Sequence, residues 1–145
     1  MATLKELRDE RLRKLDDLKK LGFDPYPAKS ERTHKLAELT ENFDKLENQT
    51  VKVVGRIVGI RKFGQLAFIV LKDMGGQVQL FLKSDTVEQL NASESQVGMA
   101  ELPLLDPGDF VQAEGPLIKT KTGEVSVDVR KLRLLTKSLR PMPTK

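Results

Sequence analysis

The chain contains 145 residues, and its 25 basic and 21 acidic residues give a net charge of +4. This length suits one domain with a small accessory element and excludes a large two-domain enzyme. The absence of cysteine excludes disulfides and thiolate zinc sites, and a single histidine excludes a multi-histidine metal cluster. We therefore expect no metal site. The charged amino-terminus and the lack of a long apolar run predict a cytoplasmic protein without a membrane segment.

The charge is unevenly distributed along the chain. Residues 51–83 carry six basic residues and one acidic residue, and residues 84–118 carry seven acidic residues and no basic one. Residues 119–145 carry eight basic and two acidic residues. If the fold brings the two basic blocks together, they form one positive face suited to a polyanion. Scattered, solvated charge is the alternative interpretation.

The amino-terminal segment predicts a helix over residues 2–21, because leucines recur near the helical period of 3.6. Thr3 and Glu6 have the spacing of a capping box, and Gly22 is placed to end the helix. The leucine face needs a partner, which is either the rest of this chain or a second copy. Packing on its own domain is the favoured alternative.

A proline-rich stretch over residues 23–29 is expected to be extended, and a shorter helix should follow it. Thr33 is its predicted cap. Its apolar face would consist of Leu36, Leu39 and Phe43.

From residue 51 the apolar period changes to two, which indicates strands. A long strand over residues 51–61 should bend at Gly55 and Gly59. Two hairpins are expected, with strands at residues 66–72 and 77–82 and then at residues 110–118 and 124–129. In the last segment the apolar residues stand at odd positions up to Val129 and at even positions from Leu132, and this change predicts a bulge or a strand end. Between the hairpins we expect a short helix at residues 84–90 and an irregular acidic connection that ends in a turn at residues 106–109.

This order of elements predicts an α+β, mainly β fold: a five-stranded Greek-key OB-fold barrel preceded by amino-terminal helices. A five-stranded sheet of another topology is the structural alternative. The expected division is a helical extension at residues 1–50, the barrel at residues 51–136, and the start of a linker at residues 137–145.

Strand parity predicts which side chains of the first hairpin face outward. With a two-residue turn, one face is wholly apolar and forms the core, with Ala67, Ile69, Leu71, Val78, Leu80 and Leu82. The opposite face carries Phe68, Val70, Lys72, Gln77, Gln79 and Phe81. In the last strand Val125 and Val127 should point inward, so Glu124, Ser126 and Asp128 should point outward.

The outer face has the residue types that bind single-stranded nucleic acid. Aromatic rings such as Phe68 stack on bases, amides such as Gln79 read base edges, and basic residues hold phosphates. The alternative for Phe68 and Phe81 is that the amino-terminal helical segment covers them. Glu124, at a hairpin tip, is either a solvated turn residue or an acceptor for a base amine.

Three segments resemble a known family. Residues 55–80 resemble the start of the anticodon-binding domain of class IIb aminoacyl-tRNA synthetases, in the stretch GRIVGIRKFGQLAFIVLKDMGGQVQL. Residues 11–27 (RLRKLDDLKKLGFDPYP) and 119–145 (KTKTGEVSVDVRKLRLLTKSLRPMPTK) resemble bacterial-type lysyl-tRNA synthetases, and the resemblance covers nearly the whole chain.

The resemblance implies roles for individual residues. Phe68 would stack on an anticodon uridine, Gln79 and Glu124 would recognise anticodon bases, and Arg61 would contact the anticodon. Ile60 and Gln65 stand where basic residues are common in the family, so the chain lacks two of its positive charges. Backbone phosphates would be held by Lys62, Lys119 and Lys121.

The resemblance further implies that this chain recognises the U-rich anticodon of tRNA(Lys). The class II catalytic motifs do not occur in it, so it has no expected catalytic residue, and residues 137–145 would lead to an absent catalytic domain. ATP and Mg²⁺ are expected only for a full-length lysine–tRNA ligase, as is most of any homodimer contact. Two alternatives remain: a general single-stranded nucleic-acid-binding OB-fold protein, and a protein-interaction module that docks through its leucine-rich helix.

Overall fold

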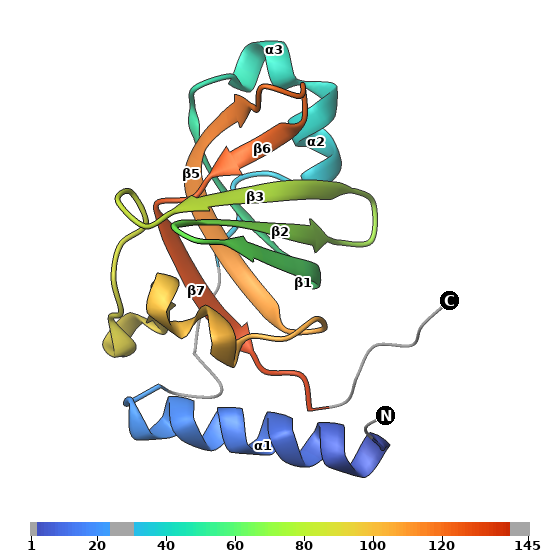
Figure 1. Cartoon of the computed structure of the whole chain (residues 1–145). Coiled ribbons are helices and arrows are strands. Elements are labelled where there is room, and N and C mark those ends of the chain that lie inside the picture. The colour runs from blue at the N-terminus through green and yellow to red at the C-terminus, as the bar shows by residue number, and fades with distance from the viewer. Residues whose placement is uncertain (1–2, 24–30, 140–145) are drawn as a thin grey trace.

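The computed structural model describes residues 3–23 and 31–139, and its centre is a closed barrel (Figure 1). Around the barrel the strands follow the order β1, β2, β3, β6, β5, and β5 pairs with β1 to close it. All neighbours are antiparallel except β3 and β6, which are parallel. The barrel strands are β1 (Thr50–Phe63), β2 (Leu66–Lys72), β3 (Gln77–Lys83), β5 (Phe110–Lys119) and β6 (Val125–Asp128). The predicted OB-fold is confirmed.

Two further strands extend the sheet from β5: β7 (Lys131–Thr136) and the short β4 (Gln96–Val97). The parity change in the last segment marks the break between β6 and β7, which pair one after the other with the same edge of β5, opposite β1. The predicted helix at residues 84–90 is wrong, because residues 84–86 form a turn and residues 88–90 have no regular structure. Helical turns occur later in this connection, at η1 (Ala92–Glu94) and η2 (Met99–Leu104).

Strand β1 bends as its glycines predicted. Its first half pairs with β5, and from Arg56 onward it pairs with β2, with a bulge in this pairing between Ile57 and Gly59. A Cβ on Gly55 would lie 2.7 Å from the carbonyl oxygen of Lys72, so only glycine lets the strands approach this closely. The bend lets one strand belong to both sides of the barrel.

The predicted inward and outward faces of the first hairpin are confirmed. Ile69 pairs with Leu80, and both are fully buried, whereas Phe68 pairs with Phe81 on the opposite face. The turn between the strands has four residues, from Asp73 to Gly76, and not two. Because four is also an even number, the parity of the pairing is the same.

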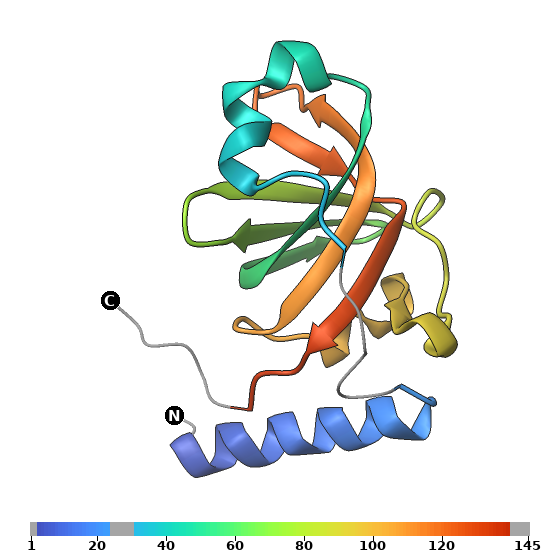
Figure 2. The same ribbon diagram turned by 180° about the vertical axis from the view of Figure 1, so that it is seen from behind.

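Helix α1 (Leu4–Lys20) has the predicted capping box between Thr3 and Glu6. Gly22 has a φ of 97° and ends the helix, with the amide of Phe23 bonded to the carbonyl of Leu18 as in a Schellman motif. The helix lies below η2 and the end of β7, away from β2 and β3 (Figures 1 and 2). Leu18 is buried in this contact, but Leu4 is 74% exposed, so only part of the leucine face packs on the chain's own domain.

The second predicted helix is divided into α2 (Leu36–Glu41) and α3 (Phe43–Leu46). Its predicted apolar face is buried. Thr33 is not its cap, because its backbone amide donates to the carbonyl oxygen of Lys52 and its hydroxyl accepts from the amide of Lys52. The amide of Leu36 donates instead to the carboxylate of Asp73 in the β2–β3 turn, at 3.1 Å. The predicted extension at residues 24–29 and the linker residues 140–145 lie outside the described residues.

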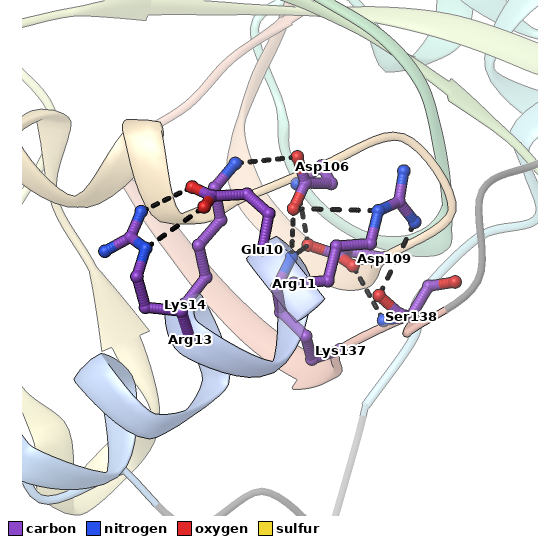
Figure 3. Close-up of polar contacts among 8 residues, drawn as sticks. All are labelled: Glu10, Arg11, Arg13, Lys14, Asp106, Asp109, Lys137 and Ser138. Atoms are coloured by element: carbon purple, nitrogen blue, oxygen red, sulfur yellow. Dashed lines mark hydrogen bonds and ion pairs between the residues drawn. The ribbon is translucent and has the colours of Figure 1, made fainter. Parts of the chain in front are cut away.

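A buried ionic cluster joins α1 to the loop before β5 and to the residues that follow β7 (Figure 3). The ammonium of Lys137, 1% exposed, lies 2.7 Å from Asp106 and 2.8 Å from Asp109. Lys14 of α1 binds the other oxygen of Asp106 at 2.8 Å, and the amide of Ser138 donates to Asp109. The turn predicted at residues 106–109 is confirmed, because the amide of Asp109 donates to the carbonyl of Asp106.

Candidate nucleic-acid interface

Four side chains from four strands form one row across the outer face of the barrel. Arg61 of β1 pairs with Phe68 of β2, Phe68 pairs with Phe81 of β3, and Phe81 pairs with Asp128 of β6. Paired residues point to the same face of a sheet. The row, which we call the aromatic row, therefore runs from a cation through two rings to a carboxylate.

The two rings of the aromatic row form a stacked pair. Their centroids lie 5.1 Å apart with an interplanar angle of 11°, and Phe63 meets Phe68 edge-on at 6.3 Å. The ammonium of Lys83 lies 5.6 Å from the centre of the Phe81 ring. Phe68 and Phe81 are both partly exposed, and α1 lies away from β2 and β3 (Figure 1). The alternative that the amino-terminal helical segment covers these rings is therefore wrong for α1.

A second row beside the first contains Gln79. Its amide nitrogen donates to the hydroxyl of Ser126 at 3.0 Å, and this hydroxyl donates to the backbone carbonyl of Glu124 at 3.2 Å. Because the hydroxyl proton is used on Glu124, Ser126 must accept from Gln79, and the amide orientation follows from the network. The carbonyl oxygen of the Gln79 amide is thereby directed away from Ser126.

The other predicted residues lie at the rim of this face. Arg61 and Lys62 are exposed at the end of β1, and Lys121 and Glu124 are exposed in the β5–β6 turn. The ammonium of Lys119 lies 4.7 Å from the centre of the Phe43 ring, so it already has an aromatic contact. The structure thus brings Phe68 and Gln79 together on one surface, joins Gln79 to the Glu124 backbone through Ser126, and leaves the lysines around the edge.

Ser126 and Asp128 differ from the expectation in their burial. The strand pairings place them on the outer face, as expected, yet Ser126 is fully buried and Asp128 is only 8% exposed. The cause is the position of β6 between β3 and β5, whose side chains cover this short strand. Asp128 pairs with Arg130 at 3.2 Å. Burial of this kind is not visible in strand parity, although the alternation did place both residues on the correct face.

Metal ligands and membrane segments were also sought in the described parts of the chain. Within residues 3–23 and 31–139, no three acidic or histidine side chains are grouped so that they would hold a metal ion. In the same residues, none of the helices has the length and apolar character needed to cross a membrane.

Comparison with known proteins agrees with the barrel. The sequence model of the tRNA anti-codon family, described as an OB-fold nucleic acid binding domain, matches residues 51–135. This chain belongs to that family. The matched segment contains all five barrel strands except the first residue of β1.

Similar proteins include bacterial lysine–tRNA ligases. The chain is 38% identical to the enzyme of Carboxydothermus hydrogenoformans over 98% of its own length, and 39% identical to that of Clostridium acetobutylicum over 99%. The identity to the enzyme of Clostridium perfringens is 42% over 93% of the chain. The resemblance to the anticodon-binding domain of lysyl-tRNA synthetases is thereby confirmed. The chain spans only 26% to 28% of the length of these relatives.

Proposed function

We propose that this chain recognises tRNA(Lys) by its anticodon stem-loop and places U-rich anticodon bases on the aromatic row. The stacked pair of Phe68 and Phe81 beside Arg61 is the observation that supports this most directly. A base stacked on an aromatic side chain gains about 1–3 kcal/mol, whatever the base is. The row therefore supplies affinity, and selectivity has to come from its neighbours.

Gln79 and Glu124 supply the selectivity in this proposal. Uracil presents an N3–H donor where cytosine presents an acceptor, so an oxygen at this position favours uracil. Ser126 holds the nitrogen end of the Gln79 amide and so leaves its oxygen as the acceptor. Glu124, exposed at the neighbouring turn, adds a carboxylate. A base edge left without a hydrogen-bond partner in such a site costs about 1–3 kcal/mol of binding free energy.

Cations around the rim would hold the phosphate backbone. Arg61, Lys62 and Lys121 are exposed, whereas Lys119 would have to leave its contact with Phe43 to join them. This mode of action is binding and uses no cofactor of its own. ATP, Mg²⁺, lysine attachment, homodimer formation and a place in the cytoplasm belong to the proposal for a longer ligase, in keeping with the relatives named above.

The test is binding of the chain to two RNA hairpins that share one stem. One hairpin carries a UUU anticodon loop and the other a CAU loop, and each is titrated at two salt concentrations. We expect the UUU loop to bind about tenfold more tightly, which is about 1.4 kcal/mol, and Phe68→Ala to weaken both complexes. Equal binding of the two loops would favour the general single-stranded nucleic-acid binder. Binding that Phe68→Ala leaves unchanged would contradict the aromatic row as the site.

A further inference from the structure

We propose that a groove beside β1 is a second RNA subsite, which holds the strand where it continues beyond the aromatic row. This inference rests on the proposed function and extends its site. The groove, which we call the β1 groove, is lined by Arg32, Arg56, Val58, Lys72, Met74 and Phe110. It lies where β1, the end of β2 and the start of β5 meet.

The β1 groove contains an exposed stacking platform. The guanidinium of Arg56 lies 4.8 Å from the centre of the Phe110 ring, and Phe110 is 37% exposed. The strand pairing explains the contact, because Arg56 is directly opposite Phe110. RNA-binding proteins stack unpaired bases on aromatic rings and on guanidinium planes. A base is therefore able to add to this platform on a free face.

The charge of the β1 groove fits a phosphate backbone. Arg32, Arg56 and Lys72 are exposed cations that line it. Asp73 is the acidic residue among the described residues of its lining. Its carboxylate accepts from three backbone amides, those of Leu36, Gly75 and Gly76, so it is engaged within the protein.

The position of the β1 groove makes it continuous with the aromatic row. Phe68 and Lys72 point to the same face of β2, four residues apart, and this corresponds to about 13 Å along a strand. Lys72 in turn pairs with Arg56. OB-folds bind roughly 4–16 nucleotides, and the longer sites in this range exceed what the aromatic row alone accommodates. Exposed Val58 and Met74 give the groove itself an apolar lining.

The test compares a short and a long RNA on the same chain. The short probe is an oligouridine of about five nucleotides and the long probe one of about twelve, within the range of an OB-fold site. We expect Phe110→Ala, and separately the double variant Arg56→Gln with Lys72→Gln, to weaken binding of the long probe about tenfold. Binding of the short probe should change less than about twofold, because it fits on the aromatic row alone.

The control removes the same two charges elsewhere. Lys19→Gln with Lys20→Gln acts on exposed positions at the carboxyl end of α1, which lies away from the start of β5 (Figure 1), and should leave the long probe bound as in the native chain. Thermal melting of each variant shows that it is folded, and Lys72→Gln alone, at an exposed strand end, is the fallback if the Arg56 variant unfolds. Groove variants that bind the long probe as the native chain does would overturn the proposal. The same result is expected if the groove binds an acidic protein and not RNA. Phe68→Ala separates the two proposals: if it weakens neither probe, the proposed function fails.

Discussion

Ser126 shows how one buried hydroxyl holds a half-buried side-chain amide, that of Gln79. The hydroxyl is fully buried, accepts from the Gln79 amide and donates to the Glu124 carbonyl. These contacts fix both the rotamer and the orientation of Gln79. An amide that is held in place loses less side-chain entropy when it binds a ligand, so in the proposed function the selectivity would depend on a residue that need not touch RNA.

The first prediction concerns this hydroxyl. Ser126→Ala removes the partner of Gln79, and we expect the preference for UUU over CAU to fall several-fold, since a hydrogen bond of this kind contributes about 0.5–1.5 kcal/mol. Hairpin titration measures it. Thr122→Ala removes a hydroxyl from the exposed β5–β6 turn and should leave the preference intact. An unchanged preference in Ser126→Ala would show that Gln79 does not depend on Ser126.

At the scale of elements, Asp73 connects the first hairpin to the amino-terminal helices. Its carboxylate accepts from the amides of Gly75 and Gly76 within its own turn and from the amide of Leu36 at the start of α2. Burial raises the pKa of Asp73, but these three backbone donors outweigh it and bring the pKa below the ordinary value of 3.8. One side chain thus holds the turn and anchors a helix that is distant in the sequence.

The second prediction follows from the lowered pKa of Asp73. Because the folded pKa lies below the unfolded value, the stabilisation is complete above pH 3.8 and is lost as the pH falls through the folded pKa. At neutral pH we expect Asp73→Ala to cost about 0.5–2 kcal/mol, as for the loss of a helix cap. Denaturant unfolding at pH 7 and in strong acid measures the difference, which should shrink in acid. Asp85→Ala, at an exposed turn, is the control and should show neither effect.

At the scale of the whole molecule, the ionic cluster fixes α1 and the end of β7 to one side of the barrel. Lys137 is buried between Asp106 and Asp109, and Lys14 reaches the same site from α1 (Figure 3). Burial raises the pKa of Asp109 even though Lys137 lies beside it. Asp106 is also subject to burial, but the hydrogen bonds from Lys137 and Lys14 bring its pKa below the ordinary value. The cluster therefore holds together α1, the loop before β5 and the segment after β7.

The third prediction tests this cluster. Lys137→Met leaves Asp106 and Asp109 buried without their shared cation, and loss of one partner from such a site costs about 3–5 kcal/mol. Without the cation, the pKa of Asp109 should stay above 3.8, so the folded variant is most stable below that pH and loses stability as the pH rises through the folded value. Lys14→Met, which removes a cation from Asp106 only, should cost less. Chemical unfolding at pH 5 and pH 7 checks both, and a deficit in Lys137→Met that does not shrink at the lower pH would contradict the role of Asp109.

Local patterns in the sequence were enough for the elements and their faces. Period-two alternation assigned Phe68 and Gln79 to the outer face, and the capping pattern placed the start of α1 at Thr3. These features depend on neighbours within a few residues. The predicted cap of α2, Thr33, was wrong because the helix start depends on a distant residue. The amide of Leu36 donates to Asp73, which is 37 residues further along the chain. The three-part division of the chain stays a prediction, as do the RNA-binding roles of all the predicted site residues: Arg61, Lys62, Phe68, Gln79, Lys119, Lys121 and Glu124.

The sequence by itself therefore determined the type of fold, the faces of its strands and the family resemblance. Only the tertiary structure decided that Phe68 and Phe81 stack, that Ser126 holds Gln79, and that Arg56 and Phe110 form a platform. The physical reason is that each of these contacts depends on strand register, and two of them join segments far apart in the chain. Gln79 and Ser126, for example, are 47 residues apart and meet only because β3 and β6 pair when the barrel closes.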